Sequence, residues 1–117
     1  MSDSVEARRV ADAQLAAYNA QDMEAYLALF HADAVLINLP DQTVVAEGLE
    51  AIRQMYTARF DTPGLRCEVH HRSEIGNIAI DRETVHTDGS APVDILAMYE
   101  VIDRKIKRIF FVRGGEL

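Results

Sequence analysis

The spacing of apolar residues along the chain is helical in the first half and strand-like in the second. The change falls at a Pro-Gly pair, residues 63–64, which is a typical helix stop. Ser4 and Asp22 are N-capping residues that begin the first two helical segments. The pattern predicts three helices and one short β-branched strand, over residues 4–19, 22–30, 48–60 and 34–39, respectively.

The second half of the chain predicts four consecutive strands, over residues 66–74, 78–86, 92–102 and 105–113. The turns between them are short, which implies antiparallel hairpins. Helices grouped first and strands grouped last indicate an α+β fold, with three N-terminal helices packed on one face of a curved, mainly antiparallel sheet. We expect a single domain over residues 1–113 and a flexible tail over residues 114–117.

Composition narrows the class of protein without giving a function. The 117 residues carry 12 Lys+Arg and 19 Asp+Glu, a net charge of −7 that argues against binding to nucleic acid. The single cysteine excludes an intramolecular disulfide and a Cys-based zinc site. The chain begins without a basic and apolar leader and contains no membrane-length apolar run, so we expect a cytoplasmic protein that does not contact the membrane.

A polar residue interrupts the apolar stripe of the first predicted helix. Gln14 shares a helical face with Val10, Ala17 and Tyr18. It is either a core-edge side chain bonded to backbone, which is the usual fate of a buried polar group, or a hydrogen-bonding group aimed into a cavity.

Tyr18, Tyr56 and Tyr99 lie on predicted inward faces of three different elements. Three tyrosines that face one interior would suit a ligand pocket, which is mostly apolar with a few converging polar groups. For any one of them alone, ordinary core packing with the hydroxyl at the rim is the favoured explanation.

Asp81 and Glu83 share one face of a predicted strand, roughly 6.5–7 Å apart along it. Two carboxylates at this distance can divide acid and base roles if burial separates their pKa values. Neither face of this strand is cleanly apolar. Because carboxylates are seldom fully buried, the pattern favours a solvated polar face.

Other chemistry has little support in the sequence. His70 and His71 are adjacent in a strand and point to opposite faces, so a metal site would need His70 with Glu68, or His71 with a residue such as His86. No recognised metal or nucleophile motif is present, and we expect neither a metal nor a cofactor. The basic residues Lys105, Lys107, Arg108 and Arg113 indicate a solvated strand face or an interface.

Several runs are similar to the nuclear transport factor 2 superfamily of cone-shaped α+β barrels. They are residues 17–22 (AYNAQD), 26–34 (YLALFHADA) and 48–52 (GLEAI). Residues 75–83 (IGNIAIDRE) and 98–101 (MYEV), followed by the Lys-Ile pair at 105–106, resemble the SnoaL-like branch of that superfamily. The superfamily includes polyketide cyclases, ketosteroid isomerases and limonene epoxide hydrolases, so the resemblance implies a fold more than a reaction.

The catalytic positions of two enzymatic branches hold other residues in this chain. At the positions of the ketosteroid isomerase Tyr, Asp base and protonated Asp, the sequence has Gln14, Asn38 and Ala97, which argues against isomerisation by that mechanism. The Arg and Asp positions of the epoxide hydrolases fall near Glu83, Val85 and Phe111 in this sequence, so that catalytic triad is absent as well.

The resemblance does imply a pocket between the first and third helices and the concave sheet face, where Gln14, Tyr18, Asn38, Tyr56 and Tyr99 would meet. It also implies a homodimer through the outer sheet face, with Phe110 and Val112 alternating with Phe111. Three hypotheses follow: a pocket for a small, mostly hydrophobic molecule, an isomerase, cyclase or hydrolase that uses Glu83 and Asp81 as acid or base, and a dimeric interaction module without a ligand.

Overall fold

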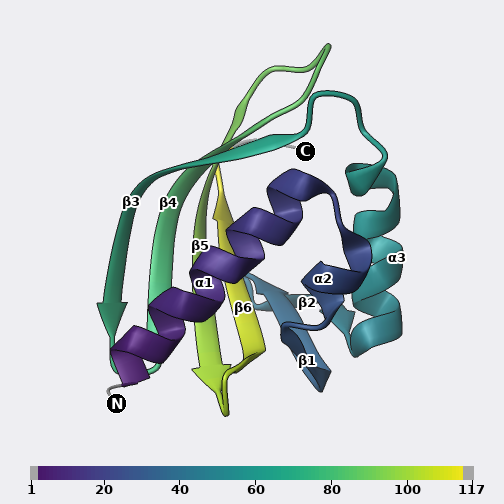
Figure 1. The fold of residues 1–117 in the computed structure, drawn as a ribbon. Helices are drawn as coiled ribbons and strands as arrows, with labels where there is room; N and C mark the ends of the chain where they lie inside the picture. Colours follow the sequence, from purple (N-terminus) through teal and green to yellow (C-terminus); the bar gives the residue numbers. More distant parts are fainter. Residues whose placement is uncertain (1–2, 115–117) are drawn as a thin grey trace.

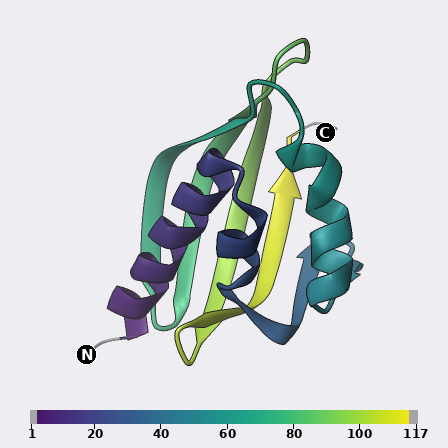
Figure 2. The same cartoon turned by 45° about the vertical axis from the view of Figure 1, so that its right-hand side comes forward.

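Three helices and six strands make up the fold of residues 3–114, which the computed structural model describes. The helices pack on one face of a single sheet (Figures 1 and 2). Their order along the chain is α1 (Asp3–Ala20), α2 (Met23–Leu27), β1 (Phe30–Asn38), β2 (Thr43–Glu47), α3 (Leu49–Phe60), β3 (Arg66–Ile75), β4 (Ile78–His86), β5 (Val93–Ile102) and β6 (Lys105–Arg113).

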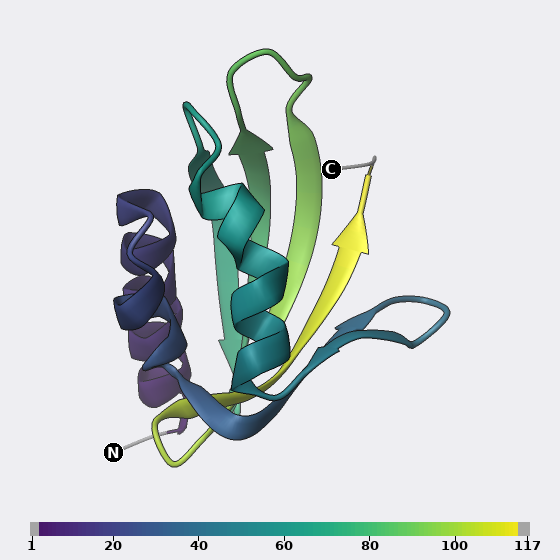
Figure 3. The ribbon, with the colours of Figure 1, turned by 90° about the vertical axis from the view of Figure 1, so that its right-hand side faces the viewer.

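The sheet has the strand order β2-β1-β6-β5-β4-β3 and is antiparallel except between β1 and β6. This confirms the predicted α+β fold. The sheet is mixed because the last strand, β6, pairs in parallel with the first strand, β1. In the side view of Figure 3, the β1–β2 hairpin projects away from α1.

Three elements differ from the sequence-based prediction: α2, β2 and β1, which begins at Phe30 rather than at residue 34. The second helix ends at Leu27 rather than near Phe30, because the backbone N–H of Ile106 already binds Leu29 O at 2.7 Å and draws the chain into β1. Strand β2 was not predicted at all. It is a short edge strand whose Val44 and Val45 are exposed, so it lacks the alternation of apolar and polar residues that marks a half-buried strand.

The concave face of the sheet forms the core together with α1 and α3. On β5 every second residue from Val93 to Val101 is buried, as the alternation predicted. The inward face of α1 includes Val10, Gln14, Ala17 and Tyr18, all buried. None of the described helices is long and apolar enough to cross a membrane.

The connections 61–65 and 87–92 lie together at one end of the fold (Figure 1). The backbone N–H of Asp88 binds Pro63 O at 3.0 Å and joins them. The end of α3 and the end of β6 lie nearby, and we call this end of the cone its open end. Of the predicted tail, the structure describes only Gly114, whose N–H binds Asp94 O at 2.8 Å, whereas residues 115–117 lie outside the described residues.

Candidate functional site

Both carboxylates of β4 point into the protein. Asp81 is fully buried and Glu83 is 6% exposed, and both lie on the same face of β4 as the buried residues Ala79 and Val85. The interpretation of this strand as a solvated polar face was therefore wrong. It rested on the rarity of buried carboxylates, and it missed the groups from other elements that make their burial possible.

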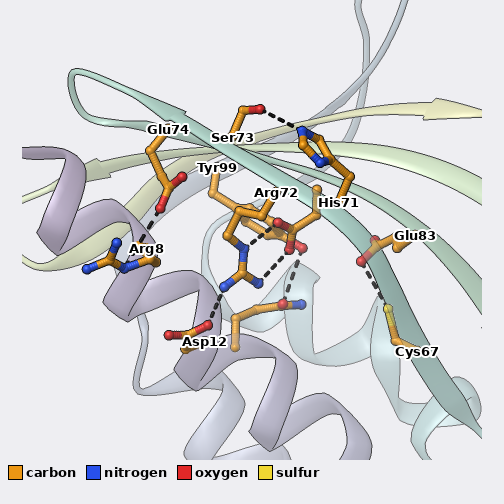
Figure 4. Close-up of polar contacts among 11 residues, drawn as sticks. Arg8, Asp12, Cys67, His71, Arg72, Ser73, Glu74, Glu83 and Tyr99 are labelled. Atoms are coloured by element: carbon orange, nitrogen blue, oxygen red, sulfur yellow. Dashed lines mark hydrogen bonds and ion pairs between the residues drawn. The ribbon is translucent and has the colours of Figure 1, made fainter.

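Asp81 is held by an arginine of the neighbouring strand. Arg72 Nε and Nη2 donate to the two carboxylate oxygens at 2.5 and 2.9 Å, and Arg72 Nη1 also donates to Asp12 of α1 (Figure 4). A two-point contact of this kind matches the charge of the buried carboxylate and fixes its orientation. Asp81 thus serves to fasten α1 to β3 and β4, and its oxygens are occupied.

Arg72 reaches Asp81 because strand β3 contains a bulge. Val69 pairs with Glu83 and His71 with Arg82, so His70 is the extra residue. One extra residue exchanges the two faces of a strand, which turns the side chain of Arg72 toward the concave face beside its partner Asp81. Nothing in the sequence around Arg72 distinguishes it from a solvated strand arginine.

Glu83 is a buried carboxylate without a cationic partner. Its Oε2 accepts a hydrogen bond from the Cys67 thiol at 2.9 Å (Figure 4), and no Lys, Arg or His among residues 3–114 lies within ion-pair distance. Burial raises the pKa of Glu83 to about 7, the charge of Asp81 adds to this rise, and the Cys67 hydrogen bond opposes it. Near neutral pH this group can therefore either give or take a proton.

Four of the five predicted ligand-binding residues surround Glu83. Gln14, Tyr18, Tyr56 and Tyr99 line a small cavity that also includes Glu83, Cys67, Arg59, Val85 and Arg113, and we call this space the inner cavity. Gln14 is not bonded to backbone; its Oε1 accepts a hydrogen bond from the Tyr99 hydroxyl at 3.2 Å. The Tyr18 hydroxyl is buried and has no hydrogen-bond partner.

The fifth residue, Asn38, is not part of this wall. It lies at the end of β1 and lines a separate groove with Leu39, Pro40 and Asp41, and this groove shares only Phe111 and Arg113 with the inner cavity. The predicted pocket position therefore brings together the residues of α1, α3 and β5 but not that of β1.

The inner cavity is too small for an organic molecule. Its volume of about 20 Å³ is enough for a single water. A second space of about 340 Å³ opens at the open end of the cone, within the range of small-ligand pockets, and we call it the basin. Arg59 and Val85 line both spaces, and the remaining wall of the basin is Thr62, Thr87, Ser90, Ala91 and Val93.

Two arginines that the sequence did not connect with this site line its inner cavity. Arg59 comes from the last turn of α3, and its guanidinium lies 5.6 Å from the centre of the Tyr56 ring. Arg113 ends β6 and lies 5.2 Å from the centre of the Phe111 ring. Pairing with buried Ile95 places Arg113 on the concave face, whereas Lys107 and Arg108, from the same predicted basic run, bind Asp33 and Glu100 at the surface.

The remaining candidate groups lie outside the site. His70 and His86 bind Thr84 and Glu68, and within residues 3–114 no group of three or more His, Cys, Asp and Glu side chains could hold a metal ion. Val112 is 40% exposed on the convex face, next to buried Phe111. The homodimer through this face stays a prediction.

The chain was compared with known families and structures. A family model for the SnoaL-like domain matches residues 11–109. A comparison with curated proteins gave no match.

Among solved structures, an uncharacterized cystatin fold protein from Novosphingobium aromaticivorans is 33% identical, with a TM-score of 0.82 over 97% of this chain and 99% of that one. An LEH-like epoxide hydrolase from M. tuberculosis is 19% identical, with a TM-score of 0.77 over 95% and 84%. A protein with a ketosteroid isomerase-like fold from Catenulispora acidiphila, in complex with trimethylamine, is 15% identical, with a TM-score of 0.72 over 87% and 82%. The last two likenesses show a shared fold.

Proposed function

This chain belongs to the SnoaL-like domain family, and on that premise we propose that it binds a small, mostly hydrophobic molecule at the open end of the cone and exchanges a proton with it through Glu83. The observation that carries the proposal is a buried carboxylate without a cationic partner, in the wall of a cavity that adjoins a ligand-sized basin. Burial of an unpaired carboxylate lowers the stability of the folded protein, so a purely structural role does not explain it. Acid–base chemistry is the usual function of such a group.

The surroundings of Glu83 suit proton transfer on a weakly polar substrate. Tyr56 and Tyr99 supply aromatic wall, and Val85 and Val93 extend the apolar surface into the basin. A pKa of about 7 matches the solution pH of a cell, where an acid–base group is most effective. The basin gives the substrate access from solvent without exposing the carboxylate.

The reaction class we propose is proton transfer at a carbon next to a carbonyl, the step shared by many isomerisations and cyclisations. Ionised Glu83 takes the proton, the C–H electron pair forms the C=C bond of an enolate, and the carbonyl π electrons move to oxygen. Protonated Glu83 then returns a proton to the same or another carbon. This use of β4 is independent of the isomerase positions, which hold Gln14, Asn38 and Ala97 here.

The rival hypothesis, an interaction module without a ligand, gives Glu83 no role. Such a module would be more stable with an apolar or amide side chain at this position, because nothing in the described protein neutralises the charge. The near-complete filling of the inner cavity fits this rival, but the basin above it does not.

The test is deuterium exchange into carbon acids. A panel of cyclic ketones and cyclic 1,3-diketones is screened for binding by ligand-observed NMR, and each binder is then incubated with the protein in D₂O. We expect exchange at the carbon next to the carbonyl with the wild type and its loss in Glu83→Gln. The matched control is Glu100→Gln, which removes a β5 carboxylate bound to Arg108 outside the site and should exchange like the wild type. Unchanged exchange in Glu83→Gln, or a panel without any binder, would contradict the proposal.

A further inference from the structure

The two arginines at the inner cavity differ from most arginines of this protein. Seven others lie within 4.0 Å of a carboxylate, as expected for a chain with a net charge of −7. Arg59 and Arg113 have no carboxylate at that distance among residues 3–114, although both are half-buried. Each is held against an aromatic ring instead, which positions the guanidinium without neutralising it.

These arginines come from distant parts of the chain and meet at one place. Arg59 lies in the last turn of α3 and Arg113 at the end of β6, and both line the inner cavity with Glu83. Burial lowers the pKa of Arg113, and the like charge of Arg59 lowers it further. Two neighbouring positive charges that face one partly desolvated space are unfavourable unless a negative charge joins them.

Both unpaired polar atoms at the same cavity can donate a hydrogen bond. Arg113 Nε is buried and has no acceptor, and an arginine side chain can only donate. The Tyr18 hydroxyl, also buried and without a partner, lies in the same wall. Arg59 lines the same cavity as Tyr18, and its charge opposes the effect of burial on the pKa of Tyr18. Arg113 Nε requires an acceptor and the Tyr18 hydroxyl can donate to the same atom, so an acceptor completes this set and a negative charge fits it best.

We propose that the molecule bound at the open end carries a carboxylate, or a chemically similar oxyanion, that Arg59 and Arg113 bind with the Tyr18 hydroxyl as a third donor. Because the inner cavity has room for one water-sized group, a single carboxylate oxygen occupies it, and the apolar body of the ligand lies in the basin against Val85 and Val93. Because Glu83 lines the same inner cavity, the carbons near the carboxylate come closest to it. The substrate class is therefore an oxo acid with an apolar body, in which a ketone carbonyl near the acid group acidifies the C–H bond that Glu83 deprotonates. This inference rests on the proposed function.

The test compares pairs of ligands that differ only in charge. The probes are 2-naphthoate with 2-naphthamide, and cyclohexanecarboxylate with cyclohexanecarboxamide, titrated at pH 7 and low salt by ligand-observed NMR. Two charge-assisted hydrogen bonds predict that the wild type prefers each carboxylate by about tenfold or more. In Arg59→Met and Arg113→Met this preference should fall toward one, while the affinity for the amide changes little.

The chain offers a matched control and a readout that needs no variant. Arg104 has no ion pair among the described residues but lies exposed in the turn between β5 and β6, so Arg104→Met should keep the full preference. In the wild type, the Nε–H resonance of Arg113 should shift on addition of 2-naphthoate and not of 2-naphthamide.

The outcomes separate this inference from the proposed function. Equal binding of acid and amide, or a preference that survives both substitutions, overturns the anion site and leaves the pocket intact. If neither member of either pair binds, the pocket itself is wrong and the anion site fails with it.

Discussion

Replacement of Glu83 by glutamine should stabilise the protein, and the gain should grow as the pH rises. The amide keeps the size of the side chain and can still accept the Cys67 hydrogen bond, but it carries no charge to be desolvated. Burial raises the pKa of Glu83 from an ordinary 4.5 to about 7. The folded protein therefore binds more protons than the unfolded chain between these two values.

The sign and size of the effect follow from this difference in pKa. The stability that wild-type Glu83 contributes in its protonated form is fully present below pH 4.5, and it is lost as the pH rises through 7. The full difference between the two pKa values corresponds to about 3 kcal/mol. Glu83→Gln removes this loss, so we expect its free energy of unfolding to match that of the wild type near pH 4.5 and to exceed it by up to about 3 kcal/mol at pH 8.

Urea unfolding followed by circular dichroism, from pH 4.5 to 8.5, measures this directly. The difference between variant and wild type cancels the contributions of the histidines. Glu100→Gln serves as the control of opposite sign, because Arg108 lowers the pKa of Glu100; it should cost up to about 1 kcal/mol and stay flat across this range. A difference for Glu83→Gln that does not change with pH, or a loss of stability at pH 8, would refute the reasoning.

Three further predictions concern the groups around Glu83. Arg72→Met leaves Asp81 buried without its counter-charge, so it should lower the free energy of unfolding in urea by about 3–5 kcal/mol. Adding Asp81→Asn to the same chain should recover a large part of this loss. An Arg72→Met variant as stable as the wild type would contradict this role. Tyr99→Phe leaves the buried amide oxygen of Gln14 unpaired and should lower the free energy of unfolding by about 1–2 kcal/mol. Tyr18→Phe removes a hydroxyl without a hydrogen-bond partner and should change this free energy very little. Equal losses in the two variants would refute the assignment. Burial and the charge of Glu83 raise the pKa of the Cys67 thiol. A disulfide reagent at pH 8 should therefore modify Cys67 about two orders of magnitude more slowly in the folded protein than in the chain unfolded in urea. A similar rate in both states would exclude the buried position.

The fold was largely predictable because its signals are local. The alternation along β5 and the stripe on α1 each identify a buried face within one element, and short turns fix antiparallel neighbours. What the sequence did not reveal depends on pairing between distant segments. Helix α2 ends early because the backbone N–H of Ile106 binds Leu29 O. Strand β2 forms because it pairs with the edge of β1.

The sequence predicted which residues of the candidate site lie together, but it did not predict which charged residues join them. Gln14, Tyr18, Tyr56 and Tyr99 do lie together, since each sits on an inward face that periodicity identifies. The roles of Arg59 and Arg113 were missed because their neighbours in sequence are ordinary surface residues; only the packing of α3 and β6 brings them to the cavity. The unpaired state of both arginines is likewise a property of the folded arrangement.

The contrast between Asp81 and Glu83 explains why one carboxylate of β4 is available for chemistry. The two lie on the same strand and the same face, and neither is exposed. The bulge at His70 brings Arg72 to Asp81, two residues too far along the strand to neutralise Glu83 as well. Asp81 is paired with Arg72, while Glu83 is left in the wall of the inner cavity beside the two unpaired arginines.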